Sequence, residues 1–269
     1  MATASSAEPP PAVADGGGEA PDALLGGRLR LFQPAQGYRA AIDPVLLAAA
    51  VPARAGERLL ELGLGSGAAA LCLLRRVAGC RVAGLELQPE LAALARRNAS
   101  ENGLSDRLEV VEGDLRRLPA GLGRGYDRVF ANPPFHGEAR PSPDAQRATA
   151  HHAAAGELCD WIEAALRCLR PEGTLTLILR SDRLPEALAA LAGRAGELRL
   201  LPLWPKPGRP ARRLLLQARK GARAPLILLS GMLLHEADGR FTLAADAVLR
   251  DAVALPLSAE EGWRPPQEI

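Results

Sequence analysis

The sequence is poor in cysteine, lysine and aromatic residues, and these shortages exclude several kinds of protein. No two of its four cysteines, Cys72, Cys80, Cys159 and Cys168, form the close C-x-x-C pair typical of a zinc site. We therefore expect no metal centre, and we expect the cysteines to be reduced thiols in a cytoplasmic protein.

Long apolar runs are also absent. No stretch reaches the roughly 18 consecutive apolar residues of a transmembrane helix, so we expect no membrane span. The first residues lack the basic start and the continuous apolar stretch of a signal peptide. Lysine occurs only at Lys206 and Lys220, so nearly all positive charge comes from arginine. Arginine suits phosphate recognition, but we favour a GC-rich coding sequence as the reason for this bias.

The length of 269 residues suffices for one large α/β domain with extensions. Residues 1–22 are mainly Ala, Pro, Gly, Ser and acidic residues without periodicity, so we expect a disordered tail there. We expect a single domain over residues 23–257, without internal repeats, and a short C-terminal tail over residues 258–269.

The central stretch of the chain is Asn132-Pro133-Pro134-Phe135, shortly after a strand-like run at residues 126–130. Two successive prolines cannot continue a helix or donate to a sheet ladder, so we expect the strand to end there. Ligands of open α/β sheets bind at the carboxyl ends of the strands. The Asn132 side-chain oxygen and the Pro133 carbonyl are acceptors suited to an –NH2 group, and the Phe135 ring offers a face for stacking.

A glycine-rich loop, Glu61-Leu62-Gly63-Leu64-Gly65-Ser66-Gly67, overlaps the end of a strand-like run at residues 58–62. Its glycines allow a sharp turn and a close approach to a ligand, in front of a following helix. The first two glycines and Ala68 also satisfy the dinucleotide fingerprint G-x-G-x-x-A, with Glu86 about twenty residues on. On this motif alone, a nicotinamide or flavin enzyme stays open.

Acidic residues mark the ends of two more strand-like runs. The run 81–85 leads into Glu86-Leu87, and the run 108–112 is followed by Asp114-Leu115. A carboxylate at a strand end can accept hydrogen bonds from ribose hydroxyls or from an amino group. Each acid alone is as consistent with a solvated turn. Three acids at consecutive strand ends, together with Asn132, indicate one ligand site.

The segment before the glycine loop contains Tyr38-Arg39 and then Ile42-Asp43-Pro44. Asp43 before Pro44 predicts a helix N-cap with proline at the first helical position. Further along, a long polar loop at residues 136–150 contains Arg140 and precedes His151-His152. Its length suggests a functional or mobile segment. The two histidines could contact the phosphates or bases of a substrate, but histidines in such places are more often solvated helix caps.

Residues 204–225 carry basic side chains and no acidic one. The basic residues are Lys206, Arg209, Arg212, Arg213, Arg219, Lys220 and Arg223. An uncompensated cluster of this size attracts a polyanion, and the predicted hairpin flanks the strand ends, so we expect a nucleic-acid path there. The alternative is a solubilising loop at a sheet edge. No function is assigned to residues 226–257.

These motifs together resemble those of the class I S-adenosylmethionine (AdoMet) methyltransferases that methylate planar exocyclic or amide nitrogens. From about Leu25 to Leu257, their order is similar to that in the bacterial tRNA adenine-N6 methyltransferases, which modify the base next to the anticodon of a valine tRNA. The resemblance implies an α/β, Rossmann-like fold, with a seven-stranded, mostly parallel sheet and helices on both faces. It also implies AdoMet as the cofactor, tRNA as the substrate and direct methyl transfer.

The resemblance further implies the residues of each site, with residues 23–56 lying over the cofactor. Cofactor contacts are expected from Tyr38, Asp43, Glu61, Gly63, Gly65, Gly67, Glu86, Leu87, Asp114, Leu115 and Asn132. Catalytic positions are Asn132, Pro133, Pro134 and Phe135. RNA contacts are expected from Arg39, Arg140, Lys206, Arg209, Arg212 and Arg213.

Three positions depart from the family pattern. Glu61 stands where Asp is usual, Phe135 where Tyr is commoner, and Ala153 where an acid is expected after His151-His152. The alternatives are an rRNA guanine-N2 methyltransferase, a methyltransferase of release-factor glutamine, a catalytically silent RNA-binding module and a nicotinamide oxidoreductase. The sequence leaves the oligomeric state open.

Overall fold

The computed structural model describes residues 20–34, 39–134 and 158–257. Three residues with predicted roles, Tyr38, Phe135 and Arg140, lie outside these ranges, as do His151 and His152. Asp22, assigned above to the N-terminal tail, is the first residue of a small antiparallel sheet. Its strands are β1 (Asp22–Leu24) and β2 (Leu29–Leu31).

The main sheet contains the seven expected strands and two short strands that the sequence did not predict. In chain order the seven are β3 (Arg58–Leu62), β4 (Arg81–Glu86), β5 (Leu108–Glu112), β6 (Tyr126–Ala131), β7 (Leu169–Arg180), β8 (Ala195–Trp204) and β9 (Arg213–Lys220). Their order across the sheet is β8-β9-β7-β6-β3-β4-β5. Strands β3 to β7 are parallel, and β9 is antiparallel to both neighbours. Two two-residue strands, β10 (Ile227–Leu228) and β11 (Met232–Leu233), pair with β8 and make the sheet nine-stranded.

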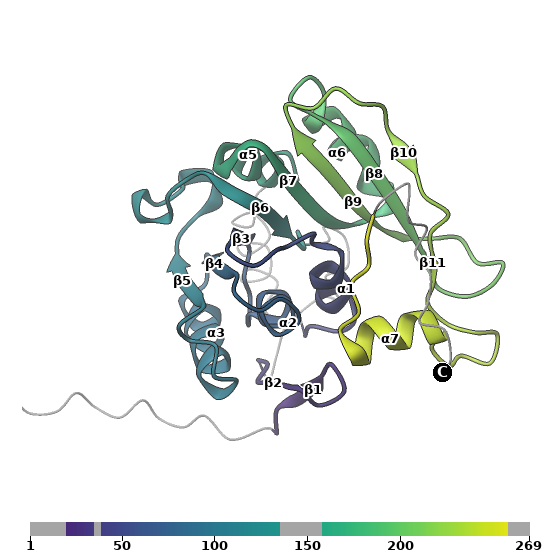
Figure 1. Cartoon of the computed structure of the whole chain (residues 1–269), viewed down its shortest axis with the longest axis horizontal. Helices are drawn as coiled ribbons and strands as arrows, with labels where there is room; N and C mark the ends of the chain where they lie inside the picture. Colours follow the sequence, from purple (N-terminus) through teal and green to yellow (C-terminus); the bar gives the residue numbers. More distant parts are fainter. Residues whose placement is uncertain (1–19, 35–38, 135–157, 258–269) are drawn as a thin grey trace, which may run out of the picture.

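Helices cover both faces of this sheet (Figure 1). One face carries α1 (Asp43–Ala50), α2 (Ala68–Arg76), α3 (Pro89–Glu101) and α7 (Leu243–Asp251). The other carries α5 (Leu158–Cys168) and α6 (Leu184–Leu191). Short 3-10 turns lie at Leu115–Arg117, Ala120–Leu122 and Ser181–Arg183. The parallel strands lie between two helical layers, which explains their nearly continuous apolar sequences.

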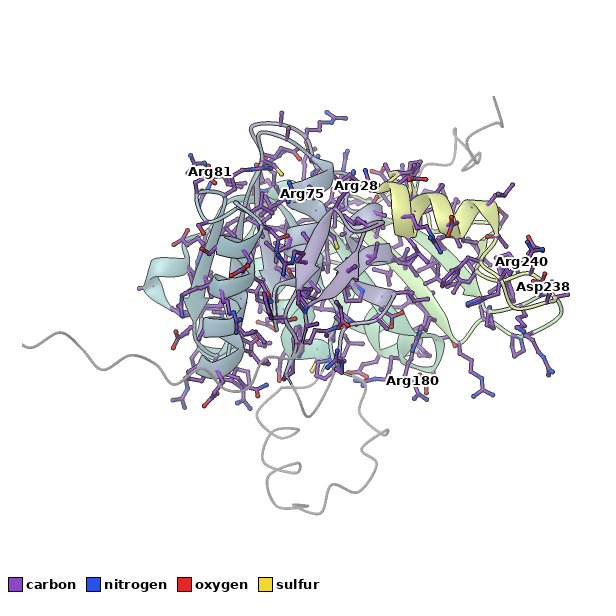
Figure 2. The ribbon with its side chains drawn as sticks, turned by 90° about the horizontal axis from the view of Figure 1, so that it is seen from below. Arg28, Arg75, Arg81, Arg180, Asp238 and Arg240 are labelled. Carbon is purple, nitrogen blue, oxygen red and sulfur yellow. The ribbon has the colours of Figure 1, made fainter. Side chains whose placement is uncertain are left out.

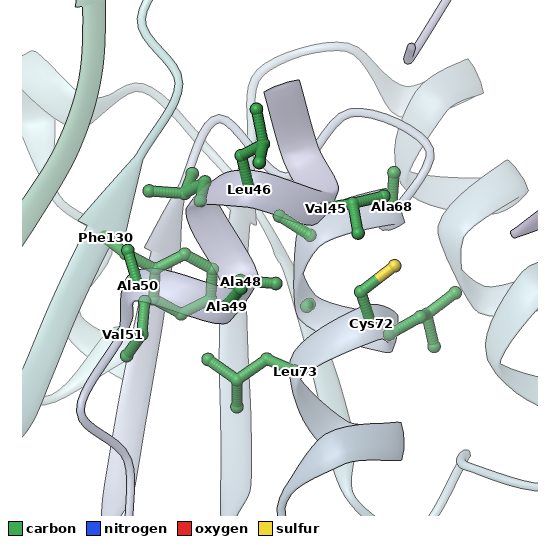
Figure 3. Close-up of a cluster of buried hydrophobic side chains, with 14 of the residues drawn as sticks. Val45, Leu46, Ala48, Ala49, Ala50, Val51, Ala68, Cys72, Leu73 and Phe130 are labelled. Atoms are coloured by element: carbon green, nitrogen blue, oxygen red, sulfur yellow. The ribbon is translucent and has the colours of Figure 1, made fainter. Parts of the chain in front are cut away.

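Helix α1 is buried along its whole length. It packs against α2, with the fully buried Phe130 ring of β6 beneath it (Figure 3). This location explains why its sequence, DPVLLAAA, is apolar on nearly every side rather than on one stripe. Because α1 directly precedes β3, its burial fixes the chain just before the glycine loop.

Strand β7 contains a bulge at Pro171-Glu172-Gly173, three residues whose sequence is typical of a turn. The pairing with β6 passes from Leu169 directly to Thr174. Glu172 has a φ of 61°, in the left-handed region that bulges often use.

Two absences hold for the residues that the structure describes. All four cysteines are free, as predicted. No described helix combines the length and the apolar character needed to cross a membrane.

Candidate active site at the carboxyl ends of the strands

The carboxyl ends of four parallel strands lie side by side. Leu62 of β3 is opposite Leu85 of β4 on one side and Ala131 of β6 on the other. Glu86, at the end of β4, is opposite Glu112 at the end of β5. The fold therefore brings the glycine loop, the two later acidic turns and the Asn-Pro-Pro segment to one edge of the sheet.

All three glycines of the loop adopt positive φ angles. The values are 66° at Gly63, 57° at Gly65 and 88° at Gly67. A Cβ added to Gly63 would lie 2.4 Å from the Trp161 ring of α5, whereas one added to Gly65 would meet nothing within 4 Å. Gly63 therefore allows the helix to pack closely, and Gly65 borders open space in which a ligand can approach the backbone.

Glu61 is buried beneath this loop, with 3% of its surface exposed. Its Oε2 accepts a hydrogen bond from the Ala70 N–H in the first turn of α2, at 2.9 Å. Burial raises the pKa of Glu61 well above its usual range, and the nearby Glu86 carboxylate raises it further. A cationic group of a ligand placed beside Glu61 would stabilise its charged form and so lower its pKa.

Glu86, the last residue of β4, forms a hydrogen bond with the glycine loop. Its Oε2 accepts from the Gly65 N–H at 2.7 Å, and its Oε1 accepts from the Gln88 N–H at 2.9 Å. Burial raises the pKa of this carboxyl, and the backbone hydrogen bonds oppose the shift. Each carboxylate oxygen has two lone pairs, so Glu86 retains acceptor capacity for ligand hydroxyls.

Asp114 caps the short 3-10 turn after β5. Its Oδ1 accepts from the Arg116 N–H at 2.9 Å, and its Oδ2 lies 2.9 Å from Arg116 Nη2. These hydrogen bonds lower the pKa of Asp114 and keep it ionised. Two apolar side chains accompany the acidic turns: Leu115 is buried, whereas Leu87 is 39% exposed. An exposed leucine at this edge is suited to pack against a planar ring.

The Asn-Pro-Pro segment continues directly from the buried end of β6. Ala131 pairs with Leu62 of β3 and with Leu177 of β7, so both neighbouring strands fix the backbone before Asn132. Asn132 is partly buried and Pro133 is buried. Phe135 lies outside the described residues, so its predicted stacking role stays a prediction.

Asp43 is not the predicted N-cap. Helix α1 begins at Asp43 itself, Ile42 occupies the cap position, and no side chain caps the helix there. The buried Asp43 carboxylate instead forms an ion pair with Arg213 of β9, with 3.1 Å between Oδ1 and Nη1. Burial raises the pKa of Asp43, and the Arg213 charge opposes the shift. An ion pair with a distant strand outcompetes local capping at this position.

The seven cations of residues 204–225 divide between two ends of the sheet. Arg213 pairs with Arg180 at the carboxyl end of β7, so the β8–β9 loop with Lys206, Arg209 and Arg212 lies at the candidate site's edge. Arg219, Lys220 and Arg223 lie at the opposite end of the sheet. There Arg219 of β9 pairs with Thr174 of β7, and Lys220 of β9 pairs with Ala195 of β8.

The expectation that all seven cations are uncompensated is wrong. Arg213 pairs with Asp43, Arg219 lies 3.3 Å from Glu197, and Lys220 Nζ donates to the Leu169 carbonyl at 2.6 Å. Within the described part of the chain, Lys206, Arg209 and Arg212 form no ion pair. Arg39, also predicted to bind RNA, pairs with Asp22 at 2.8 Å. The partners come from segments distant in sequence, where composition cannot reveal them.

Comparisons with known proteins bear on this site. A model of a methyltransferase domain matches residues 59–173. A tRNA1(Val) (adenine(37)-N6)-methyltransferase of Porphyromonas gingivalis is 33% identical over 194 residues, which cover 69% of this chain and 75% of the relative. The chain belongs to this methyltransferase family. A relative of the same description from Bacteroides fragilis is 31% identical over 177 residues, or 65% of this chain and 74% of the relative.

The fold also matches a methyltransferase of known structure. A solved structure of a predicted O-methyltransferase from Agrobacterium tumefaciens has a TM-score of 0.67 and 29% identity, over 80% of this chain and 98% of that chain. The Rossmann-like methyltransferase fold expected from the sequence is therefore confirmed.

AdoMet is the cofactor of this methyltransferase, and the residues at the strand ends fit its chemical groups. The buried Glu61 carboxylate suits the ammonium of the methionine moiety, and Glu86 suits the two ribose hydroxyls. The exposed Leu87 suits the adenine ring, and the open space beside Gly65 admits a ligand against the backbone. This fit supports the predicted residue roles, which themselves stay predictions.

The structure adds Trp161 to the residues around the methyltransferase's glycine loop. Its indole is buried and lies against Gly63, where a Cβ would clash with it. The sequence analysis assigned Trp161 no role. The available signal was one large aromatic residue on the apolar face of a helix, in a chain with only three tryptophans.

Proposed function

We propose that this methyltransferase transfers the methyl group of AdoMet to the exocyclic N6 of an adenine in tRNA. The proposed adenine lies next to the anticodon of a valine tRNA. The relatives described as tRNA1(Val) (adenine(37)-N6)-methyltransferases support this choice of substrate. The proposal applies to the base and its position, since the methyltransferase family is already established for the chain.

The observation that carries the proposal is the position of Asn132-Pro133 at the end of β6, beside the glycine loop after β3. The Asn132 side-chain oxygen and the Pro133 carbonyl are two acceptors on a backbone fixed by two neighbouring strands. Together they suit the two hydrogens of an exocyclic amino group. A hydroxyl substrate has only one such hydrogen, so the pair favours nitrogen.

Positioning is the main catalytic device under this proposal. AdoMet supplies an electrophilic methyl group on a sulfonium when it is bound. The two acceptors of the Asn-Pro-Pro segment orient the amino nitrogen so that its lone pair faces the glycine loop, where the cofactor binds. No strong general base is needed, because the amino proton can leave after the nitrogen becomes cationic. The acceptors also stabilise the positive charge that develops on the amino group.

The test is transfer of labelled methyl from AdoMet to tRNA and rRNA that lack their own modifications, followed by nucleoside analysis. N6-methyladenosine in the tRNA fraction alone is the expected result. N2-methylguanosine in rRNA would retain the chemistry and overturn the substrate. Label in neither RNA, with AdoMet still bound, would overturn the nucleic-acid assignment and favour protein glutamine as the acceptor.

A further inference from the structure

A hairpin at residues 234–242, to which the sequence assigned no function, lies at the same edge of the sheet as the candidate site. Its ends are joined by the hydrogen bond from the Thr242 N–H to the Leu234 carbonyl, at 3.0 Å. A β-bridge between His235 and Phe241 closes it further. The Leu234 N–H donates to the Trp204 carbonyl at 2.8 Å, so the hairpin starts at the end of β8.

The hairpin contacts the basic β8–β9 loop, residues 205–212. His235 Nδ1 lies 3.0 Å from the Pro205 carbonyl at the start of the loop. At the hairpin tip, a Cβ added to Gly239 would lie 3.4 Å from Lys206 Nζ. The loop and the hairpin therefore form one continuous surface at the carboxyl edge of the sheet, which we call the basic platform (residues 205–212 and 234–242).

An aromatic face belongs to this platform. The Phe241 ring stacks on His235 with 4.6 Å between centroids and an angle of 25° between planes, and it is 36% exposed. Aromatic residues make up only 3% of the chain. Among the large apolar side chains exposed in the described residues, only Phe241 and Trp204 are aromatic, and Trp204 directly precedes the loop.

The charge of the platform is positive. Lys206, Arg209 and Arg212 form no ion pair with described residues, while Arg240 pairs with Asp238 at 2.7 Å. The Arg240 side chain remains 83% exposed, and Figure 2 shows this pair at the periphery of the molecule, far from Arg81. Cations beside an exposed ring are the combination that binds single-stranded nucleic acid, since phosphates bind the cations and an unpaired base stacks on the ring.

We propose that the basic platform binds a single-stranded segment of the RNA substrate, with an unpaired base stacked on Phe241 and phosphates held by Lys206, Arg209 and Arg212. This inference rests on the proposed function, because it takes the substrate to be RNA. It places a second RNA contact beside the site that holds the target base. Such a contact selects an unpaired loop over a duplex, whose bases are not available for stacking.

The stacking contact is tested with two substitutions at one position. Phe241→Leu keeps an apolar side chain against His235 but removes the ring, and Phe241→Tyr keeps the ring. Affinity is measured for a short single-stranded oligoribonucleotide, for the same sequence as a duplex and for an unmodified tRNA transcript. We expect Phe241→Leu to weaken single-strand and tRNA binding by about fivefold or more, and Phe241→Tyr to bind as the original chain does.

The phosphate contacts are tested with a triple variant and a control of equal charge change. Lys206→Glu, Arg209→Glu and Arg212→Glu together are expected to weaken binding and to reduce the slope of log K against log salt by about 2. The control combines Arg54→Glu, Arg81→Glu and Arg124→Glu, three exposed arginines at or just before the amino ends of β3, β4 and β6. We expect the control to retain clearly more affinity than the platform triple.

These binding assays separate the inference from the proposed function. Single-strand binding that depends on Phe241 would support the platform even if nucleoside analysis found a different methylated base. If both Phe241→Leu and the platform triple bind RNA as the original chain does, with AdoMet binding intact, the basic platform is not an RNA-binding surface. The hairpin would then be a candidate contact for a protein partner. Equal losses in the platform triple and the control triple would overturn the inference as well.

Discussion

The Arg213 guanidinium lies 3.1 Å from the carboxylate of Asp43, and the two residues come from opposite parts of the chain. Asp43 opens the buried helix before the glycine loop, and Arg213 opens the strand after the basic loop. The ion pair therefore joins the predicted cofactor segment to the predicted RNA segment. Asp43 is buried, whereas the Arg213 side chain is 46% exposed.

Removing Arg213 should destabilise the protein in a pH-dependent way. Arg213→Ala leaves a buried carboxylate without its cation, and we expect a loss of about 1–2 kcal/mol in unfolding free energy at pH 8. Burial already raises the pKa of Asp43, and loss of the opposing charge raises it further. Stability linked to this group is present at low pH and is lost as pH rises through the folded-state pKa, so the loss should be smaller at pH 5.

Urea unfolding at the two pH values measures this effect. Asp43→Asn in the Arg213→Ala background is the control, because a neutral amide needs no cation and should remove the added pH dependence. An equal loss at pH 5 and pH 8 would show that Arg213 acts by packing rather than by charge.

Glu61→Gln should separate stability from cofactor binding. The neutral amide can still accept from the Ala70 N–H, and it avoids burying a charge next to Glu86. We expect the cofactor-free variant to be more stable than the original protein at pH 8, with the difference vanishing at low pH. We expect AdoMet affinity to fall by about tenfold or more, because a charge-assisted contact with an ammonium is lost.

Calorimetry with AdoMet and thermal unfolding without it measure the two quantities on the same samples. S-adenosylhomocysteine keeps the amino-acid moiety of the cofactor, so its affinity should fall in parallel. Unchanged affinity for both ligands would remove Glu61 from the cofactor site.

Gly65→Ala should impair AdoMet binding more than it impairs folding. The alanine would carry a φ of 57°, which costs about 1–2 kcal/mol, but its Cβ meets no protein atom within 4 Å. The added methyl group would instead occupy space beside the loop that we assign to the cofactor. We therefore expect a loss of AdoMet affinity of about tenfold or more beyond any loss of stability.

Gly56 offers a matched control, because it has a φ of 83° and equally open surroundings but precedes β3 at the far end of the strand. Gly56→Ala should show a similar loss of stability with normal AdoMet affinity. Gly63→Ala should be the most destabilising of the three, because its Cβ would clash with Trp161. Equal AdoMet affinities for Gly56→Ala and Gly65→Ala would place the cofactor elsewhere.

Asn132→Ala should retain AdoMet binding and lose most turnover. The side chain lies at the end of β6, beside the glycine loop rather than within it, and its proposed role is to orient the substrate amino group. We expect kcat to fall by about a hundredfold, a typical effect of losing a positioning contact. Normal turnover in this variant, measured as methyl transfer to unmodified tRNA, would contradict the proposed mechanism.

The parallel strands were predictable from the sequence. The bounds of β3 and β5 coincide with the runs 58–62 and 108–112. Buried parallel strands have continuous apolar sequences, and glycine, proline or acidic residues mark where they end. The same residues predicted the candidate site, because parallel strands in register bring their carboxyl ends together at one edge of the sheet.

Contacts between distant segments were not predictable. Asp43 was assigned to a cap because Asp-Pro is a local signal, whereas its observed partner is Arg213. Trp161 was missed because only the fold places it against Gly63. The proposed role of the hairpin at residues 234–242 depends on its contact with the basic loop, and no local sequence pattern predicts that contact.

Glu86 is held in place by the protein's own backbone. Each of its carboxylate oxygens accepts a backbone N–H, one from Gly65 in the glycine loop and one from Gln88 in its own turn. The side chain and the loop therefore hold each other in one conformation, so the proposed contact with the ribose costs little conformational entropy. The entropic penalty of ordering this part of the site falls on folding, which leaves more of the cofactor's interaction energy to appear as affinity.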